Sequence, residues 1–269
     1  MMNDLSARQA EIASLARSAG RIGVEDLARR YGVSAQTIRK DLNELCDRRL
    51  LTRVHGGAIV SSGVENIAYE ARRLVAAAEK RAIGVAAATL IPNSSSLFIN
   101  IGTTTEEVAK ALAAHEDLLV ITNNINVAML LYKQPRMEVI VAGGTLRRSD
   151  GAVVGASASE LIRQFKVDHA VIGASAIEAD GTLLDFDYRE VQVAQAILEN
   201  SRHAILVADS SKLERSAPVR IAHIGQVQTW VTDDARDSPV RDVCRERGVA
   251  IVEALPHGDV DEDPEARRD

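Results

Sequence analysis

The sequence is poor in the residues that mark several specialised classes of protein. Its 269 residues include only two cysteines, Cys46 and Cys244, which lie far apart and share no metal-ligand spacing. Neither a disulfide framework nor a cysteine metal site is therefore expected. The first residues also lack the basic flank and apolar run of a signal peptide. We expect a protein that is not exported and that needs no metal and no cofactor.

Long apolar runs are missing as well. The longest stretch without a charged residue spans 82–105, and Pro-Asn-Ser-Ser-Ser at 92–96 interrupts it. This stretch predicts a helix, a turn and a strand, and not a membrane span. Hydrophobic residues make up 46% of the chain and charged residues 26%, a composition typical of globular domains. We therefore expect a cytoplasmic protein that makes no membrane contact.

Positive charge is scarce over the chain as a whole, but not at its start. The net charge is −6, yet residues 1–60 carry ten basic and seven acidic side chains, whereas the remainder carries 22 and 31. DNA binding needs local positive charge, so a mildly basic head on an acidic body is compatible with it. Residues 255–269 are polar and rich in acidic side chains, which predicts a disordered tail.

The head, residues 1–60, has the apolar spacing of short helices. Apolar residues recur three and four positions apart at 12–16 and again at 24–31, and Gly32 breaks the pattern. Ser34 is a natural N-cap, so a third helix is predicted to begin directly after it. Two helices joined by a short turn that contains glycine are the signature of a helix-turn-helix.

The third predicted helix has two unlike faces. Ile38, Leu42 and Leu45 point one way and are expected to pack on the first two helices. The other face carries basic and amide side chains, which can form hydrogen bonds with the edges of DNA bases. The start of the helix has backbone N–H groups and hydroxyl side chains that can bind a phosphate. The candidate DNA-binding residues of this helix are Ser34, Gln36, Thr37, Arg39, Lys40 and Asn43. An ordinary solvated face would have the same composition, so the helix alone leaves both interpretations open.

The residues after this helix favour DNA binding. Residues 50–54 can form a short strand, His55 and two glycines supply a turn, and 58–60 can form the returning strand. This pattern predicts a small wing, which would place Arg53 and His55 near the DNA backbone. For His55 the alternative is a turn residue without a partner.

The body predicts an α/β domain over 80–254, preceded by a linker at 61–79. Apolar runs alternate with amphipathic helices, which is typical of a parallel sheet covered on both faces. The expected strands are 96–101, 118–123, 138–142, 169–173, 204–208, 229–232 and 249–253. The expected helices are 104–115, 127–132, 156–165, 189–200 and 239–247.

Polar and glycine residues gather where these strands end, which is where open α/β sheets bind ligands. Gly102, followed by Thr103, Thr104 and Thr105, opens a helix and suits a phosphate, although threonine is also an ordinary cap. The further candidate effector-binding residues at strand ends are Asn123, Asn124, Gly143, Gly144, Asp209 and Lys212. For these, capping, a tight turn and a solvated loop lysine are the alternatives.

An acidic segment precedes the predicted helix 189–200. Asp185, Asp187 and Glu190 flank two aromatic residues and could bind ligand hydroxyls or act as acid and base. Helix capping around one buried aromatic explains the same residues, so the segment alone does not decide between these interpretations.

The chain resembles the DeoR family of bacterial transcription regulators. In the head the runs VSAQTIRKDLNEL and RVHGGA carry the resemblance, with Lys40 where the family usually has a second arginine. In the body it rests on EKRAIGVAAATLI, FINIGTTTEEVAKAL, VITNNINVA, VIVAGGTLRR and LVADSSK. It implies a winged helix-turn-helix joined to a Rossmann-like sensor domain that resembles sugar-phosphate isomerases.

Three runs are similar to one branch of this family, which represses the genes for glycerol 3-phosphate utilisation. They are VENIAYEAR, FINIGTTTEE and LLDFDYREVQVAQAI. This resemblance implies a repressor whose inducer is glycerol 3-phosphate or a close phosphorylated triol or sugar. Two-fold proteins read two-fold DNA sites, so double-stranded operator DNA and a homodimer or homotetramer are expected.

Two other functions remain open from the sequence. An enzyme is one, because Asp185, Asp187, Glu190, His169 and Lys212 are all acid or base types. No nucleophile–base motif or metal spacing accompanies them, and an isomerase has no need of the head, so we expect no catalysis. An activator with the same head is the other, because activation or repression depends on where the operator lies.

Overall fold

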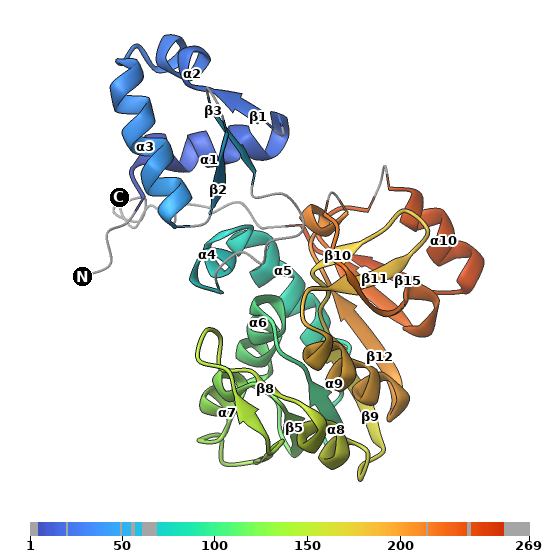
Figure 1. Ribbon diagram of the computed structural model, residues 1–269. Coiled ribbons are helices and arrows are strands. Elements are labelled where there is room, and N and C mark those ends of the chain that lie inside the picture. The colour runs from blue at the N-terminus through green and yellow to red at the C-terminus, as the bar shows by residue number, and fades with distance from the viewer. Residues whose placement is uncertain are drawn as a thin grey trace, which may run out of the picture.

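The computed structural model describes residues 5–19, 21–48, 50–54, 57–60, 69–213, 215–235 and 238–255. They form a small N-terminal head and a larger α/β body (Figure 1). This is the predicted fold class. The predicted disordered tail lies outside the described residues apart from its first position, and it stays a prediction.

The head contains the three expected helices and a small sheet. The elements are α1 (Ala7–Ala19), β1 (Arg21–Gly23), α2 (Val24–Tyr31), α3 (Ala35–Asp47), β2 (Leu51–Val54) and β3 (Gly57–Val60). Gly32 ends α2 with a φ of 61°, and Ser34 caps α3 by accepting a hydrogen bond from the Thr37 amide at 3.1 Å. Ile12, Ile38 and Leu42 are fully buried in the head's own core.

The strands β2 and β3 form the expected wing, and β3 also pairs with β1, so the antiparallel order is β1-β3-β2. The strand β1 was not predicted, because three residues between two helices are too few to show a period of two.

The body is built on a seven-stranded parallel sheet in the order β15-β14-β12-β9-β4-β5-β6. The strands are β4 (Ser96–Ile99), β5 (Leu118–Thr122), β6 (Met137–Val141), β9 (Val167–Ile172), β12 (Ser201–Val207), β14 (Thr229–Thr232) and β15 (Ala250–Glu253). The helices are α4 (Tyr69–Leu74), α5 (Ala77–Ala88), α6 (Thr103–Leu112), α7 (Ile125–Leu131), α8 (Ala156–Ile162), α9 (Tyr188–Glu199) and α10 (Pro239–Arg247).

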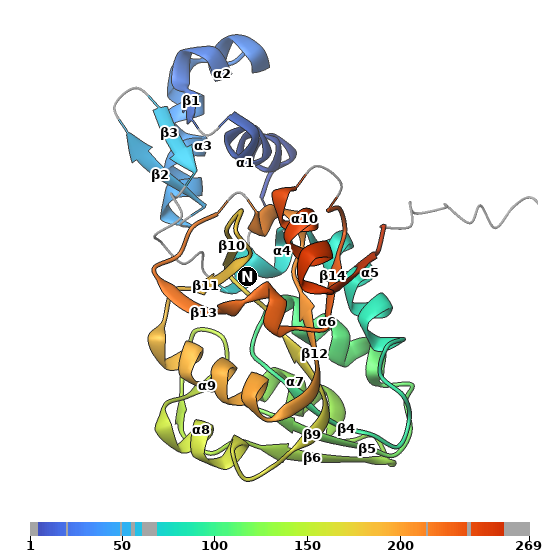
Figure 2. The same cartoon turned by 90° about the vertical axis from the view of Figure 1, so that its right-hand side faces the viewer.

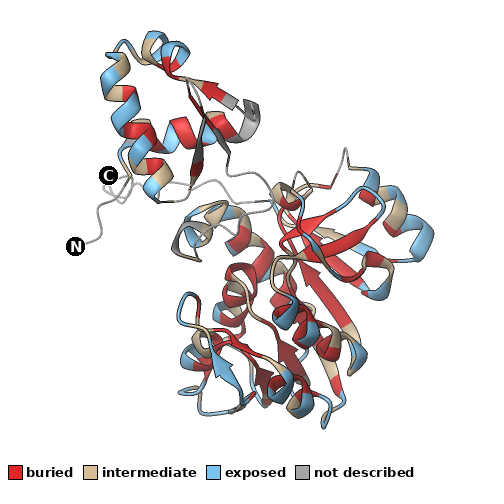
Figure 3. Cartoon of the chain, viewed as in Figure 1, coloured by how far each residue is buried: buried red, intermediate tan, exposed pale blue. Residues whose placement is uncertain are grey.

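Helices cover both faces of the sheet, as the apolar strands predicted. On β4, Leu97 and Ile99 pack with α5, α6 and α7 in one apolar core. Phe98 between them points the other way, into a second core with α8, α9 and α10. Figure 2 shows the sheet between α5 and α6 on one side and α8 and α9 on the other. In Figure 3 the central strands of the sheet are largely buried, whereas the helices keep one exposed face.

Smaller elements decorate this frame. The antiparallel sheet β10-β11-β13 consists of β10 (Ala176–Ile177), β11 (Thr182–Asp185) and β13 (Val219–His223). A hairpin is formed by β7 (Thr145–Leu146) and β8 (Val153–Val154), and η1 (Ser210–Lys212) and η2 (Ile224–Gln226) are 3₁₀ turns. None of these was predicted, because their strands are short and partly polar. The helix α4 and the start of α5 occupy part of the expected linker.

The strand order contains a switch point between β4 and β9. From β4 the chain adds β5 and β6 on one side, and it then returns to build β9, β12, β14 and β15 on the other. The loops that follow β4 and β9 therefore leave in opposite directions and open a crevice at the carboxyl edge of the sheet. Asn100 and Ile101, predicted to continue the strand, belong instead to the loop after β4.

Two further observations concern the described residues alone. Among them no helix is long and apolar enough to cross a bilayer. Within the same part of the chain, no group of three or more histidine, cysteine or acidic side chains is placed to hold a metal ion.

Candidate functional site

The first candidate site is the outer face of α3 in the head. Its predicted DNA-contacting side chains, Gln36, Arg39, Lys40 and Asn43, are exposed, while the opposite face of the helix is buried in the head core. The polar face is therefore free to enter a groove. Ser34 and Thr37 lie at the helix start with their hydroxyl oxygens 2.9 Å apart, so Ser34 acts as a cap.

A buried acidic residue fixes this face in place. Asp41 is 5% exposed, and it accepts hydrogen bonds from Arg8 Nε at 2.7 Å and from Gln9 Nε2 at 3.4 Å. These contacts tie α1 to α3 beside a shallow hollow that Arg8, Gln36 and Lys40 help to line. The sequence reasoning missed Arg8, because its pairing with Asp41 joins residues 33 positions apart.

The wing residues are described only in part. Arg53 lies on β2, as predicted, but its side chain is outside the description, and His55 lies outside the described residues altogether. Their proposed contact with the DNA backbone stays a prediction.

Replacing Arg39 by alanine is expected to weaken DNA binding about 5- to 150-fold, because an arginine–base contact is worth about 1–3 kcal/mol. Its one ion pair, to Glu25 at 3.9 Å, is exposed and adds little stability. Fluorescence anisotropy with operator DNA at several salt concentrations measures this. Arg29→Ala, an exposed arginine of α2 outside the predicted contact face, is the matched control. Equal affinities at low salt for Arg39→Ala and the unmodified chain would contradict the groove assignment.

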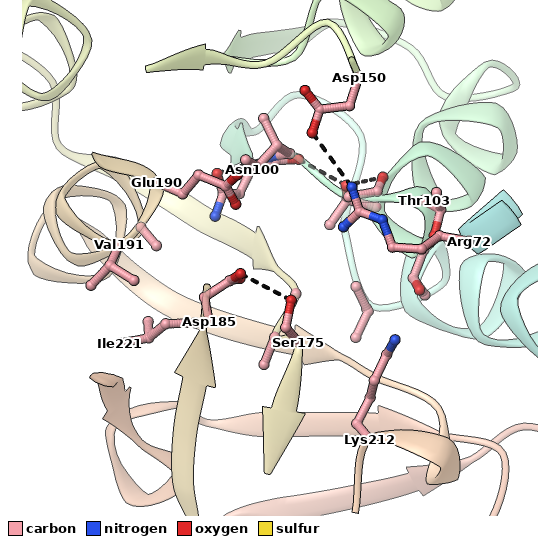
Figure 4. A pocket seen from close by; sticks show the side chains of 18 of the residues that line it. Arg72, Asn100, Thr103, Asp150, Ser175, Asp185, Glu190, Val191, Lys212 and Ile221 are labelled. Carbon is pink, nitrogen blue, oxygen red and sulfur yellow. Dashed lines mark hydrogen bonds and ion pairs between the residues drawn. The ribbon is translucent and has the colours of Figure 1, made fainter. Parts of the chain in front are cut away.

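The second candidate site is a pocket at the switch point of the body sheet. The loop after β4 and the start of α6 form one wall, and the loop after β9 forms another. Figure 4 shows Arg72, Thr103 and Lys212 on one side, with Glu190, Val191 and Ile221 across from them. Segments from α4, β11, α9 and η1 complete the lining.

The start of α6 offers donors to an anion. Gly102 precedes the helix with a φ of 142°, a conformation that favours glycine, and it lines the pocket together with the first residues of the helix. The first amides of a helix have no partner within the helix and can bind an anion. Thr105 is fully buried, and its hydroxyl donates to the carbonyls of Asn100 and Gly102, both at 2.8 Å. Its hydroxyl therefore fastens the loop, while the Thr103 and Thr104 hydroxyls donate to no group among the described residues.

Two cationic side chains line the same part of the pocket. Lys212, at the end of η1, is 9% exposed, and its ammonium group has no hydrogen bond or ion pair within the described part of the chain. Burial lowers the pKa of Lys212 to about 8, although Asp209 acts in the opposite direction. Arg72 reaches the pocket from α4 and has a side chain only 18% exposed. Two buried or half-buried cations beside a helix start, of which Arg72 also pairs with Asp150, provide the electrostatics of a phosphate site.

A third cation lies close behind them. Burial lowers the pKa of Arg215, and the neighbouring Arg72 adds to this effect. Like Lys212, Arg215 has no ion pair among the described residues, so the charges of this cluster are only partly compensated by the carboxylates of Asp209 and Asp185.

The opposite wall carries carboxylates organised by one arginine. Arg147, 19% exposed, binds Asp150 through Nε at 2.8 Å, contacts Asp187 at 3.2 Å, and also pairs with Glu190. Burial alone would lower the pKa of Arg147, but Asp150 and Glu190 hold it above its ordinary value.

The carboxyl groups nearest the cavity are Asp185 and Glu190. Burial, assisted by Asp185, raises the pKa of Glu190 to about 7 against the pull of Arg147. Asp185 accepts a hydrogen bond from the Ser175 hydroxyl at 2.9 Å. The pocket thus has a cationic end that suits a phosphate and an acidic end whose oxygens can accept hydrogen bonds from hydroxyl groups.

About half of the predicted effector-binding residues line this pocket. They are Gly102, Thr103, Thr104, Thr105, Asp185, Glu190 and Lys212. The others lie outside its lining. They are Asn123, Asn124, Gly143, Gly144, Asp187 and Asp209.

The residues outside the lining have evident structural contacts. Asn123 donates to the Val153 carbonyl at 3.2 Å, and Asn124 caps α7 and donates to Glu106 at 3.1 Å. Asp187 is the N-cap of α9, and Asp209 is the N-cap of η1 directly beside Lys212. Gly143 and Gly144 lie in an exposed turn between β6 and β7.

Sequence reasoning missed Tyr69, Arg72, Asn100, Asp150 and Ser175, which also line the pocket. Tyr69 and Arg72 belong to a stretch interpreted as linker. A signal did exist, because both residues fall within the run VENIAYEAR that carried the resemblance. Asp150 is held in place by Arg147 three residues earlier, a pairing that no sequence period reveals.

Comparisons with known proteins cover both parts of the chain. The family model of the DeoR C terminal sensor domain matches residues 75–234, and that of the DeoR-like helix-turn-helix domain matches residues 8–63. Among solved structures, a D-ribose-5-phosphate isomerase covers 50% of this chain and 52% of its own, with a TM-score of 0.38 and 16% identity.

Three curated relatives are similar over most of the chain. The glycerol-3-phosphate regulon repressor of Haemophilus influenzae is 45% identical over 87% of this chain and 92% of its own length. The Escherichia coli protein of the same name is 44% identical over 82% and 88%. The HTH-type transcriptional repressor CsqR of Escherichia coli is 39% identical over 94% and 96%. All three are transcriptional repressors and not enzymes, and with both family models matched, this chain belongs to the DeoR family of transcriptional regulators.

Proposed function

We propose that this protein represses genes for glycerol or glycerol 3-phosphate utilisation and leaves its operator when glycerol 3-phosphate binds in the body pocket. The observation that carries this proposal is Lys212, a buried cation without an ion pair among the described residues, which lines a pocket together with the start of α6. A phosphate neutralises this cation and accepts hydrogen bonds from the free amides of the helix.

The acidic end of the pocket supports a polyol as the remainder of the ligand. Asp185 and Glu190 present carboxyl oxygens that can accept hydrogen bonds from ligand hydroxyls. A bare phosphate would leave these groups without such partners. The two relatives named glycerol-3-phosphate regulon repressor agree with this choice of ligand.

The exposed polar face of α3 is the proposed DNA-reading surface, with Arg39 and Lys40 as its cations. A two-fold operator requires two heads, so we propose a homodimer, or a homotetramer built from dimers, acting in the cytoplasm. The ligand must bind more tightly to the arrangement that does not fit the operator, because only differential affinity shifts such an equilibrium.

Operator binding in the presence of ligand tests this function. The operator is first selected from random duplexes with the ligand-free protein, and anisotropy then gives its Kd with and without glycerol 3-phosphate. We expect saturating ligand to raise the Kd about 10- to 100-fold, the range of typical allosteric couplings. Glycerol at the same concentration is the control and should have no effect. An operator Kd that glycerol 3-phosphate leaves unchanged would overturn the assignment of this inducer.

A further inference from the structure

The short helix α4 is placed between the two functional parts of the chain. In sequence only residues 61–68 separate it from β3, the last strand of the head. In space it packs against α6, whose first turn forms the anion end of the pocket (Figure 1). Two of its residues, Tyr69 and Arg72, line that pocket.

Polar contacts, and not an apolar core, hold α4 on the body. The Tyr69 hydroxyl donates to Glu106 Oε2 at 2.6 Å and accepts from Asn126 Nδ2 at 2.9 Å. Lys80 Nζ donates to two carbonyls, that of Arg72 within α4 and that of Val75 directly after the helix. Among the described side chains of α4, which are those of Tyr69, Arg72, Arg73 and Leu74, none belongs to the apolar cores of the body, and Leu74 is 70% exposed. A segment that buries so little apolar surface opens at low free-energy cost.

The Arg72 guanidinium uses only part of its capacity to donate hydrogen bonds. Its one ion pair joins Nη2 to Asp150 Oδ2 at 3.5 Å. Its Nε is buried and has no hydrogen-bond acceptor within the described residues. Asp150 does not depend on this pair, because Arg147 Nε donates to its other oxygen at 2.8 Å. Arg72 can therefore turn to a new acceptor without leaving a buried carboxylate unpaired.

An anion bound in the pocket would be a hydrogen-bond acceptor for the Arg72 guanidinium. Lys212 lines the same cavity, and Arg72 and Arg215 each disfavour its charged form. A phosphate near the start of α6 would relieve this repulsion and would accept a hydrogen bond from Arg72 Nε, which has no acceptor among the described residues, in a forked contact together with a second nitrogen of the guanidinium.

We propose that Arg72 couples the pocket to the DNA-binding head: a bound phosphate captures its guanidinium and holds α4 docked on the body, and the docked form is the one that leaves DNA. This proposal rests on the proposed function and adds the residue and the helix through which the signal passes. The two states that the ligand selects between are α4 docked and α4 released.

The first experiment compares release factors, defined as the operator Kd at saturating glycerol 3-phosphate divided by the Kd without ligand. Saturation is established for each variant by calorimetry. We expect a factor of about 10–100 for the unmodified chain, below about 3 for Arg72→Gln, and an intermediate value for Arg72→Lys, which keeps the charge but not the fork. Arg81→Gln, an exposed arginine of α5, is the matched control and should keep the full factor. If saturated Arg72→Gln releases DNA as fully as the unmodified chain, Arg72 does not couple the two parts.

The second experiment follows α4 itself by hydrogen exchange, with inorganic phosphate and glycerol 3-phosphate as separate probes. We expect either probe to slow exchange at 69–74 and at the start of α6 in the full chain, and only at α6 in Arg72→Gln. Protection of α6 without protection of 69–74 in the unmodified chain overturns the proposal, as does the absence of protection at both places. Protection of both helices without any change in operator Kd would support the capture of α4 by the phosphate, but it would refute both the coupling to the head and the proposed inducer function.

Discussion

Replacing Lys212 by methionine is expected to weaken glycerol 3-phosphate binding about 100-fold. The side chain is 9% exposed and lacks any ion pair among the described residues, so its charge is available to the ligand. Removing one partner of a buried charge pair costs about 2–5 kcal/mol, and tenfold in affinity corresponds to about 1.4 kcal/mol. Isothermal titration calorimetry on the full chain measures the loss directly.

A matched control for this variant lies on the helix that opens the pocket. Lys110→Met removes a lysine of α6 that is about half exposed and pairs with Glu107 outside the pocket lining. It should bind glycerol 3-phosphate within twofold of the unmodified chain, since exposed pairs contribute about 0–1 kcal/mol. Should both variants bind equally well, Lys212 would not be a phosphate ligand.

The pH dependence of binding provides a second readout for the same residue. Because burial lowers the pKa of Lys212 to about 8, the free protein loses this charge as the pH rises through 8, and binding must then take up a proton. Affinity should therefore fall between pH 7.5 and 9.5, a range in which the phosphate itself no longer titrates. In Lys212→Met this fall should disappear. A profile with the same slope in both proteins would assign the titration to another group.

The second large effect is expected from Arg147→Met, which should destabilise the body by about 3–5 kcal/mol at pH 8. The guanidinium pairs with three carboxylates, those of Asp150, Asp187 and Glu190, and its side chain is 19% exposed. Without the guanidinium, the three carboxylates stay close together and partly buried, so their negative charges repel one another without a compensating cation. Urea unfolding at fixed ligand concentration gives the change in the free energy of unfolding.

The destabilisation should shrink as the pH falls. In the variant Glu190 loses the guanidinium that lowers its pKa, so this pKa lies further above its unfolded value. The folded form then binds more protons and becomes relatively more stable as the pH drops toward about 5. Glu190 already has a pKa of about 7 with Arg147 in place. Arg136→Met removes an arginine whose pairs with Glu116 and Asp117 are about half exposed. It should leave the free energy of unfolding almost unchanged at any pH, because exposed ion pairs are screened by solvent. A deficit for Arg147→Met that does not vary with pH would show lost packing and not uncompensated charge.

Much of the fold could be predicted because its signals are local. A helix such as α3 is predictable because Ile38, Leu42 and Leu45 recur at helical spacing and Ser34 is suited to cap its start. The buried strands of the body are continuous apolar runs, which no solvent-exposed element would tolerate. The prediction of a parallel sheet with ligand-binding residues at its carboxyl edge follows from these two patterns, and the structure has that sheet.

The remainder depends on contacts between distant residues. The hydrogen bond between Tyr69 and Glu106 joins residues 37 positions apart, and that between Arg147 and Asp187 joins residues 40 positions apart. Such contacts produce no periodic pattern in the sequence, so neither wall of the pocket could be predicted from it. The strands β11 and β13 pair with a register shift at Leu183 and Leu184, which hides their alternation. Asn123 and Asn124 make structural hydrogen bonds outside the pocket lining, and their effector-binding role stays a prediction. Residues at a strand end are as suitable for fastening a loop as for binding a ligand.

The switch point also determines when in folding the pocket can appear. The ladder between β4 and β9 joins Leu97 to His169, so it closes only after more than seventy intervening residues have been brought together. The neighbouring β4–β5 ladder, in which Leu97 pairs with Val120, needs a much shorter closure. Long closures cost more chain entropy and slow the folding step that requires them. A newly made chain thus acquires the start of α6 early but gains its opposite wall late, and it cannot respond to a metabolite before both halves of the sheet have met.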